Sequence, residues 1–141
     1  MSVVVDANVA VNWTIETPLS GDAERLLQSG IPLIAPEFII VEVTNAFYFS
    51  FRQQTGRVQR ALDGLEFLPR WFAELAPAAP LRYRAMAFAM ELDHPVYDCF
   101  YLALAESRKT RLVTADERFL RKVKDVGIYA NSIVHVTDWQ P

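Results

Sequence analysis

Short runs of apolar, mostly β-branched residues alternate along the chain with longer segments of helical periodicity. This alternation predicts parallel strands that are covered by helices on both faces. The runs that predict strands are 3–5, 32–35, 71–76, 111–114 and 133–136, with 126–129 as a weaker candidate. The segments that predict helices are a short one from Asn8 and the ranges 22–28, 37–54, 58–68, 81–92, 96–107 and 117–123. We therefore expect a single α/β domain over residues 1–141, built as three layers around a parallel sheet of four or five strands.

Two residues mark expected helix starts. Asn8 follows the first apolar run and is a favourable N-cap residue. Pro36 suits the start of the helix over 37–54, since proline at the first helical position loses no hydrogen bond. The same helix carries Phe47, Tyr48, Phe49 and Phe51. These aromatic residues encircle the helix, so we expect some of them in the core and the surplus on a dimer or antitoxin surface, the alternative being core alone.

Composition narrows the class of protein. Hydrophobic residues make up 52% and charged residues 22% of the 141 positions, which excludes an intrinsically disordered chain. The single cysteine, Cys99, excludes a disulfide framework and a multi-cysteine zinc site, and we expect it to serve packing. No apolar run approaches the ~20 residues that cross a membrane, and no secretory signal is visible. We therefore expect a cytoplasmic protein without membrane spans.

Two carboxylates follow apolar runs closely. Asp6 comes after Val3–Val5, and Asp116 comes after the segment 112–115. Both fall at the carboxyl ends of expected parallel strands, which is the edge where open α/β sheets bind ligands. The alternative is that each aspartate only caps the helix that follows it.

Two further carboxylates lie among apolar residues of expected helices. Glu42 stands within the segment 38–43, and Asn45 lies one turn further on the same helix face. Asp98 opens the apolar stretch 98–105. Glu42 could instead lie on a narrow exposed stripe of its helix and have no catalytic role. Asp98 could stand in the first turn of its helix only because the helix dipole favours an acid there.

The joint arrangement of these four carboxylates predicts a metal site. Burial of an isolated carboxylate is costly without a partner or a cation. If the helices start at the edge where the strands end, all four carboxylates converge, and they repel one another unless they are protonated or bridged by cations. A site of oxygen ligands suits Mg²⁺ or Mn²⁺, and such sites serve mainly phosphate chemistry.

Four segments around these carboxylates resemble the successive motifs of PIN-domain ribonucleases, and most of all those of VapC-type toxins of toxin–antitoxin systems. The segments are Val-Val-Val-Asp-Ala-Asn at 3–8, Ala-Pro-Glu at 35–37 leading to Val-Glu-Val-Thr-Asn-Ala at 41–46, Tyr-Asp-Cys-Phe-Tyr-Leu-Ala-Leu-Ala at 97–105, and Leu-Val-Thr-Ala-Asp-Glu-Arg-Phe at 112–119. The resemblance implies a PIN-like, Rossmann-like fold and a metal-dependent endoribonuclease. It also implies that the acidic site, with Mg²⁺ or Mn²⁺ as its cofactor, consists of Asp6, Glu42, Asp98 and Asp116.

The resemblance extends to supporting residues and partners. Thr114 matches a hydroxyl position before the last aspartate, and Asn8 matches a small polar position after the first. Both are expected to support the acidic residues, as is Asn45 from its place on the helix face. The implied partners are an RNA substrate, a small VapB-type antitoxin and a second copy in a homodimer. Residues 55–80 match no motif, and we expect substrate or partner specificity there.

The net charge of −3 argues at first against a nucleic-acid protein. The four carboxylates of the acidic site account for that excess, and the 14 lysines and arginines are unevenly distributed. Half of them fall within 108–124, where Arg118 and Arg121 follow Asp116 closely and are the candidates for contact with the RNA backbone. A solvated helix and turn would equally explain these residues.

Alternative interpretations stay open at this point. His94 and His135 have no second histidine at ligand spacing, so neither is expected to hold zinc or to catalyse. A phosphatase of the haloacid-dehalogenase type needs a second aspartate where Asn8 stands, and a response regulator needs paired N-terminal acids and a late lysine. The alternatives to a toxin are a non-toxin PIN nuclease of RNA processing and a catalytically idle PIN-like binding module.

Overall fold

The computed structural model describes residues 1–141, except for the side chain of Thr55. Its centre is a parallel sheet with the strand order β3-β2-β1-β4-β5. The strands are β1 (Val3–Val5), β2 (Leu33–Pro36), β3 (Glu74–Ala76), β4 (Leu112–Thr114) and β5 (Ile133–His135). β1, β2 and β4 are buried along their whole length, as expected of strands that are covered on both faces. The predicted α/β fold with a parallel sheet is confirmed.

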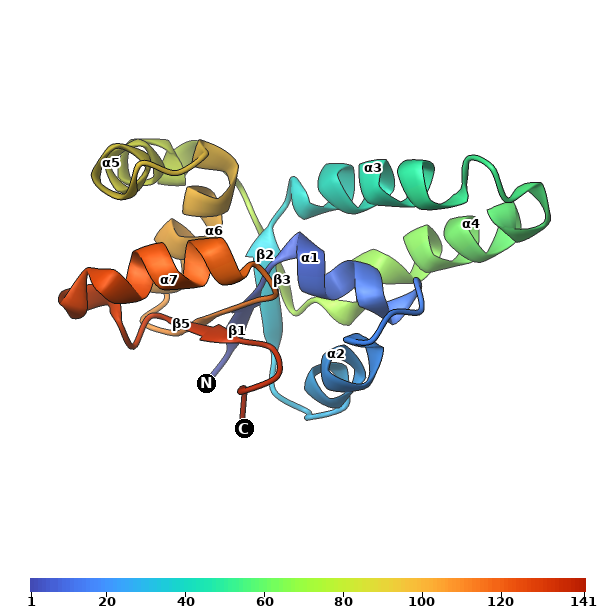
Figure 1. The fold of residues 1–141 in the computed structure, drawn as a ribbon, viewed down its shortest axis with the longest axis horizontal. Coiled ribbons are helices and arrows are strands. Elements are labelled where there is room, and N and C mark those ends of the chain that lie inside the picture. Colours follow the sequence, from blue (N-terminus) through green and yellow to red (C-terminus); the bar gives the residue numbers. More distant parts are fainter.

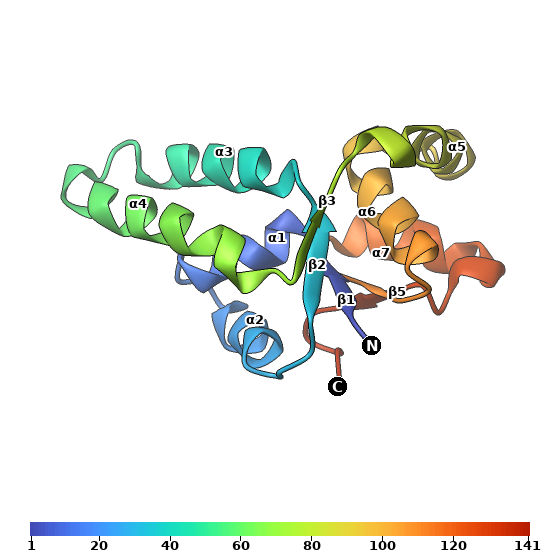
Figure 2. The same cartoon turned by 180° about the vertical axis from the view of Figure 1, so that it is seen from behind.

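The helices form a layer on each face of the sheet (Figure 1 and Figure 2). One layer holds α1 (Ala7–Ala10), α2 (Ser20–Leu27), α3 (Ile39–Phe51) and α4 (Val58–Phe67), and the other holds α5 (Arg82–Leu92), α6 (Val96–Ser107) and α7 (Glu117–Asp125). The chain runs outward from β1 to β3 and then returns to β4 and β5. Because connections between parallel strands are right-handed, this reversal of direction moves the later helices to the opposite face. β1 and β4 are therefore neighbours at the point where the strand order reverses.

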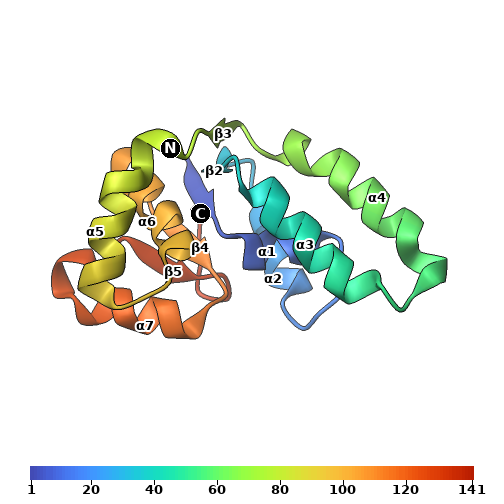
Figure 3. The same cartoon turned by 90° about the horizontal axis from the view of Figure 1, so that it is seen from above.

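Helix α3 shows how the apolar helices divide between core and surface. Ile39, Val43, Phe47 and Phe51 are buried and recur every four residues, which places them on one side of the helix. Tyr48 and Phe49 are 60% and 57% exposed. The aromatic surplus expected on the surface is thus present. Figure 3 shows α3 lying beside α4 as the two extend away from the sheet.

Three local expectations are wrong. Pro36 ends β2 instead of starting a helix, because it pairs with Ala76 at the end of the sheet, and α3 begins only at Ile39. Asn8 lies inside α1 and does not cap it, since its side chain turns across to the β4 end. The weaker strand candidate at 126–129 forms a short 3₁₀ helix, Gly127–Tyr129.

The other predicted boundaries differ from the observed ones by a few residues at most, and α6 has the predicted limits. None of the helices in the described chain combines the length and apolarity that a bilayer crossing requires.

Candidate active site

The carboxyl ends of β1 and β4 and the first turns of α3 and α6 meet at one edge of the sheet, which Figure 3 shows from above. Asp6 follows β1, and Asp116 follows β4 after one intervening residue. Glu42 lies in the first turn of α3, and Asp98 lies in the first turn of α6. The strand order reverses between β1 and β4, so this edge is where an open α/β sheet forms its ligand crevice.

Asp6 is the most deeply buried of these carboxylates. Only 3% of the residue is exposed, and its Oδ2 accepts a hydrogen bond from the Thr114 hydroxyl at 2.9 Å. Burial, and next the negative charge of Asp98, raise the pKa of Asp6 to about 7, with a smaller contribution from Glu42. The Thr114 hydrogen bond opposes this rise in pKa. Asp6 therefore lies close enough to two other acids for their charges to repel.

Asn8 and Thr114 join the end of β1 to the end of β4. The Asn8 Oδ1 atom accepts from the Ala115 N–H at 2.9 Å, and its Nδ2 lies 3.3 Å from both Asp6 Oδ2 and Thr114 Oγ1. The Thr114 Oγ1 atom in turn accepts from the Asp116 N–H at 3.1 Å. Both residues that the family motif singles out beside the acids thus lie next to Asp6.

Glu42 reaches across the sheet edge to α6. Its Oε1 accepts a hydrogen bond from the Tyr101 hydroxyl at 2.8 Å, and Tyr101 is fully buried. Burial raises the pKa of Glu42, the Tyr101 hydrogen bond lowers it, and the charge of Asp98 raises it further. Burial and the neighbouring acids also raise the pKa of Tyr101, so its hydroxyl stays a donor.

Asp98 and Asp116 lie together with His94. The Asp98 Oδ2 atom is 2.6 Å from His94 Nε2. Burial raises the pKa of Asp98, the His94 contact lowers it, and the charge of Asp116 raises it. Asp116 caps α7 by accepting from the Phe119 N–H at 3.0 Å. Ligand atoms of His94, Asp98 and Asp116 lie within 4.8 Å of one another, close enough to hold one metal ion.

The donor set fits a hard divalent cation. No lysine or arginine in the described part of the chain forms an ion pair with Asp6, Glu42, Asp98 or Asp116. Three of the four have raised pKa values, because each ionised carboxylate is partly buried beside another. A bound Mg²⁺ or Mn²⁺ would relieve this repulsion and is matched by carboxylate oxygen ligands.

Other predicted residues lie outside this network. Asn45 is exposed, and within the described chain its side chain makes no hydrogen bond to the acids. Arg118 and Arg121 are both exposed on α7, and Arg121 lines a shallow pocket with His135. Two of the seven basic residues between 108 and 124 are engaged elsewhere, since Arg108 pairs with Glu74 and Lys122 donates to the Asp93 carbonyl oxygen.

Two residues of the site were not predicted from the sequence. His94 was not expected to hold zinc or to catalyse, and no supporting role was considered for it; its contact with Asp98 was indicated only by its position four residues before that aspartate. Tyr101 gave no signal because its partner, Glu42, is 59 residues away. Cys99, expected to serve packing, is fully buried, and burial raises the pKa of its thiol to about 12.

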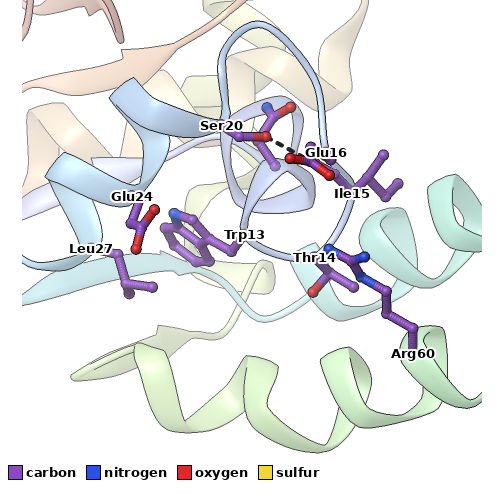
Figure 4. Close-up of a pocket in the computed structure, with 9 residues that line it drawn as sticks. Trp13, Thr14, Ile15, Glu16, Ser20, Glu24, Leu27 and Arg60 are labelled. Atoms are coloured by element: carbon purple, nitrogen blue, oxygen red, sulfur yellow. Dashed lines mark hydrogen bonds between the residues drawn. The ribbon is translucent and has the colours of Figure 1, made fainter.

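A separate pocket opens beside the segment that follows α1, between α2 and α4 (Figure 4). Trp13, Glu16, Glu24 and Arg60 are among the side chains around it. Its described lining includes none of the four carboxylates, and its own acids, Glu16 and Glu24, are exposed. The pocket is therefore distinct from the acidic edge of the sheet.

Comparison with known proteins agrees with this geometry. The family profile of the PIN domain matches residues 3–125. Ribonuclease VapC3 of Pyrobaculum aerophilum is 31% identical over 124 residues, which is 86% of this chain and 95% of that protein. The crystal structure of PAE2754 from Pyrobaculum aerophilum has the same fold, with a TM-score of 0.71 at 22% identity over 97% of this chain and 90% of that chain. The chain therefore belongs to the PIN-domain family and, within it, to the VapC-type ribonucleases.

Proposed function

We propose that this protein is a divalent-metal-dependent endoribonuclease and the toxin of a VapBC-type toxin–antitoxin pair. The observation that carries the proposal is the meeting of four carboxylates at the carboxyl edge of a PIN-type sheet, without a lysine or arginine paired to them in the described chain. The proposed catalytic residues and metal ligands are Asp6, Glu42, Asp98 and Asp116. The name of the relative Ribonuclease VapC3 supports RNA as the substrate.

The hydrogen bonds of the site leave oxygen atoms available. Glu42, Asp98 and Asp116 each accept a hydrogen bond through one oxygen, and the other oxygen accepts none from the described side chains and backbone. Asp6 is held through Oδ2 by Thr114, which also fixes the backbone before Asp116. The chain thus orients its carboxylates before any ligand arrives, and Thr114 and Asn8 are the residues we propose to support Asp6.

When bound, Mg²⁺ or Mn²⁺ would supply neutralisation of charge on the scissile phosphate and activation of the attacking water. The four carboxylates would hold the cation. Hydrolysis would leave a 5′-phosphate and a 3′-hydroxyl. The exposed Arg118, one half-turn after Asp116, is the residue we propose to contact the RNA backbone, with Arg121 beside it.

The decisive experiment is to sequence the 5′ ends of RNA fragments after controlled expression of the protein. We expect new 5′-phosphate ends with the wild type and none above background with Asp98→Asn. Purified protein is expected to give the same cuts in vitro with Mg²⁺ or Mn²⁺ and to lose them in excess EDTA. Identical fragment profiles for wild type and Asp98→Asn would reject the nuclease, and full cleavage in EDTA would reject the metal.

A toxin would also need specific partners. We propose a VapB-type antitoxin, a homodimer and a cytoplasmic location, where cellular RNA and the antitoxin would be met. Expression of the protein alone is expected to arrest growth, and co-expression of a small neighbouring reading frame with a DNA-binding N-terminus should relieve the arrest. Growth without arrest despite RNA cleavage would instead favour a PIN nuclease of RNA processing.

A further inference from the structure

His94 contacts the acidic centre, and the proposed function assigns it no task. Its Nε2 lies 2.6 Å from Asp98 Oδ2, and the His94 side chain is only 4% exposed. The imidazole thus occupies a buried position directly against a proposed metal ligand. Any part that His94 has in this centre rests on the proposed acidic site.

The fold holds His94 in place through its backbone and through its ring. Asp93, which ends α5, adopts a left-handed conformation with φ of 49°, and the His94 N–H donates to the Ala89 carbonyl oxygen at 3.2 Å. This pairing closes the helix in the manner of a Schellman motif. Lys122 of α7 donates to the Asp93 carbonyl oxygen, and the Phe119 ring packs edge-to-face on the imidazole at 4.4 Å. The ring therefore has a defined orientation toward α6.

The surroundings of Nδ1, the ring nitrogen that does not face Asp98, indicate which nitrogen of His94 carries the proton. His94 Nδ1 is buried and has no hydrogen-bond partner among the described residues. A proton on Nδ1 would be a buried donor without an acceptor, which is a costly arrangement. A proton on Nε2, by contrast, has the Asp98 carboxylate as its acceptor. The surroundings thus favour the tautomer in which Nε2–H donates to Asp98.

The same nitrogen argues against His94 as a metal ligand. A histidine that binds a metal through Nε2 carries its proton on Nδ1 and almost always donates that proton to a neighbouring acceptor. In the described chain Nδ1 meets no such acceptor. The proximity of His94, Asp98 and Asp116 therefore reflects a donor beside two acids, not three ligands.

We propose that His94 is a positioning residue, which donates its Nε2–H to Asp98 and turns that carboxylate so that Oδ1 is left for the cation. His94 occupies Oδ2, while Oδ1 accepts no hydrogen bond from the described chain. His94 thereby does for Asp98 what Tyr101 does for Glu42 and Thr114 does for Asp6. Each of these three acids thus accepts from a buried side chain, which lies on β4 for Asp6, on α6 for Glu42 and between α5 and α6 for Asp98.

Three variants at this position separate positioning from packing. His94→Gln keeps an amide donor near the place of Nε2, His94→Asn keeps an amide that stops near the place of Nδ1, and His94→Phe keeps the ring without any donor. The measurement is the affinity of the RNA-free protein for Mn²⁺ by titration calorimetry, with thermal unfolding of each variant as the check on folding. We expect Mn²⁺ to bind about 10- to 100-fold more weakly to the Phe and Asn variants and within about threefold of wild type to the Gln variant.

A second measurement reads the tautomer directly. Imidazole ¹⁵N chemical shifts of the metal-free protein are expected to show His94 protonated at Nε2 and not at Nδ1. A proton on Nδ1 would overturn the proposal, and so would wild-type Mn²⁺ affinity in His94→Phe. Equal loss of Mn²⁺ affinity in the Gln and Phe variants would identify His94 as a ligand and would also overturn it.

These outcomes are distinguishable from failure of the proposed function. Neither measurement uses RNA, so an absence of RNA cleavage would leave the positioning result standing while rejecting the nuclease. If wild-type protein bound no Mn²⁺, the proposed metal site and the role of His94 toward it would fall together. The ¹⁵N spectrum would then still report whether the hydrogen bond to Asp98 exists.

Discussion

Protonation of Asp6 makes the stability of the fold depend on pH. Burial beside Asp98 and Glu42 raises its pKa from 3.8 to about 7, so the folded protein holds a proton that the unfolded chain has released. The free energy of unfolding therefore decreases as pH rises from about 4 to about 7, by up to about 1.4 kcal/mol per pH unit. The ionised Asp6 thus destabilises the metal-free protein above pH 7.

The first prediction concerns this slope. Denaturant unfolding of EDTA-treated protein between pH 4 and 8 should show that Asp6→Asn gains stability relative to wild type as pH rises, because the asparagine has no charge to bury. The exposed Asp63→Asn on α4 serves as the control. Its free energy of unfolding should differ from that of wild type by the same amount at every pH. A constant difference between Asp6→Asn and wild type across this range would contradict the raised pKa.

The second prediction concerns Tyr101. The variant Tyr101→Phe removes the donor that lowers the pKa of Glu42, so this pKa rises and the glutamate ionises only at higher pH. We expect the rate of RNA cleavage to fall about tenfold, as is typical when the support of a ligand is lost. The acidic limb of the pH–rate profile should shift to higher pH. Tyr97→Phe, on the same helix but 66% exposed, should change neither quantity.

At the scale of elements, α4 is held against the segment after α1 by a close approach. An added Cβ at Gly64 would lie 2.5 Å from Thr14 Oγ1 and 2.7 Å from Thr14 Cγ2. Thr14 is buried and β-branched, so its side chain has little freedom to move aside. The position therefore requires glycine because of space, although a glycine inside a helix lowers its stability.

The third prediction follows from this approach. Gly64→Ala should lower the free energy of unfolding by about 1–3 kcal/mol, because the clash outweighs the gain in helix propensity. Gly21→Ala in α2 meets no atom within 4 Å and should instead raise it by up to about 1 kcal/mol. Both free energies are measured by denaturant unfolding, and a stabilised Gly64→Ala protein would show that the two elements are more loosely packed.

At the scale of the whole molecule, the last residues complete the fold on the side away from the acidic edge. The family match ends at residue 125, yet β5 and the segment after it lie beyond that point. Trp139 is 1% exposed, and Arg25 Nη2 of α2 lies 3.3 Å from its carbonyl oxygen and from that of Val136. Figure 1 shows the C-terminus below the sheet, near the start of β1. We propose on this basis that residues 1–141 act as one domain.

The fourth prediction tests that proposal. Trp139→Ala should reduce the free energy of unfolding by about 3–5 kcal/mol, which is typical for removal of a buried tryptophan. The cleavage rate per folded molecule should stay at the wild-type value, since in the described part of the chain none of the four acids forms a hydrogen bond or an ion pair with Trp139. The exposed Gln140→Ala is the matched control and should leave stability unchanged. A Trp139→Ala protein as stable as wild type would show that the tail lies outside the cooperative unit.

The order of the elements and the four carboxylates were predictable from the sequence, because both depend on local pattern. Short apolar runs identify buried strands, and an acid placed directly after such a run lies at the ligand edge of a parallel sheet whatever the details of packing. Glu42 and Asp98 were singled out by a different local pattern, since each is a carboxylate among the apolar residues of an expected helix. Only tertiary structure decided which side chains support them.

The hydrogen-bond partners of the acids depend on how the helices are rotated and packed. Local periodicity in the sequence does not predict this packing. Tyr101 meets Glu42 only because α6 packs across the edge from α3, and Asn8 bonds to Ala115 only because β1 and β4 are neighbours. Asn45 shares a helix face with Glu42 but makes no hydrogen bond to the acids in the described chain. The sequence by itself thus determined the fold class and the acidic residues, whereas the tertiary structure decided the donors that orient them, because those contacts join segments far apart in the chain.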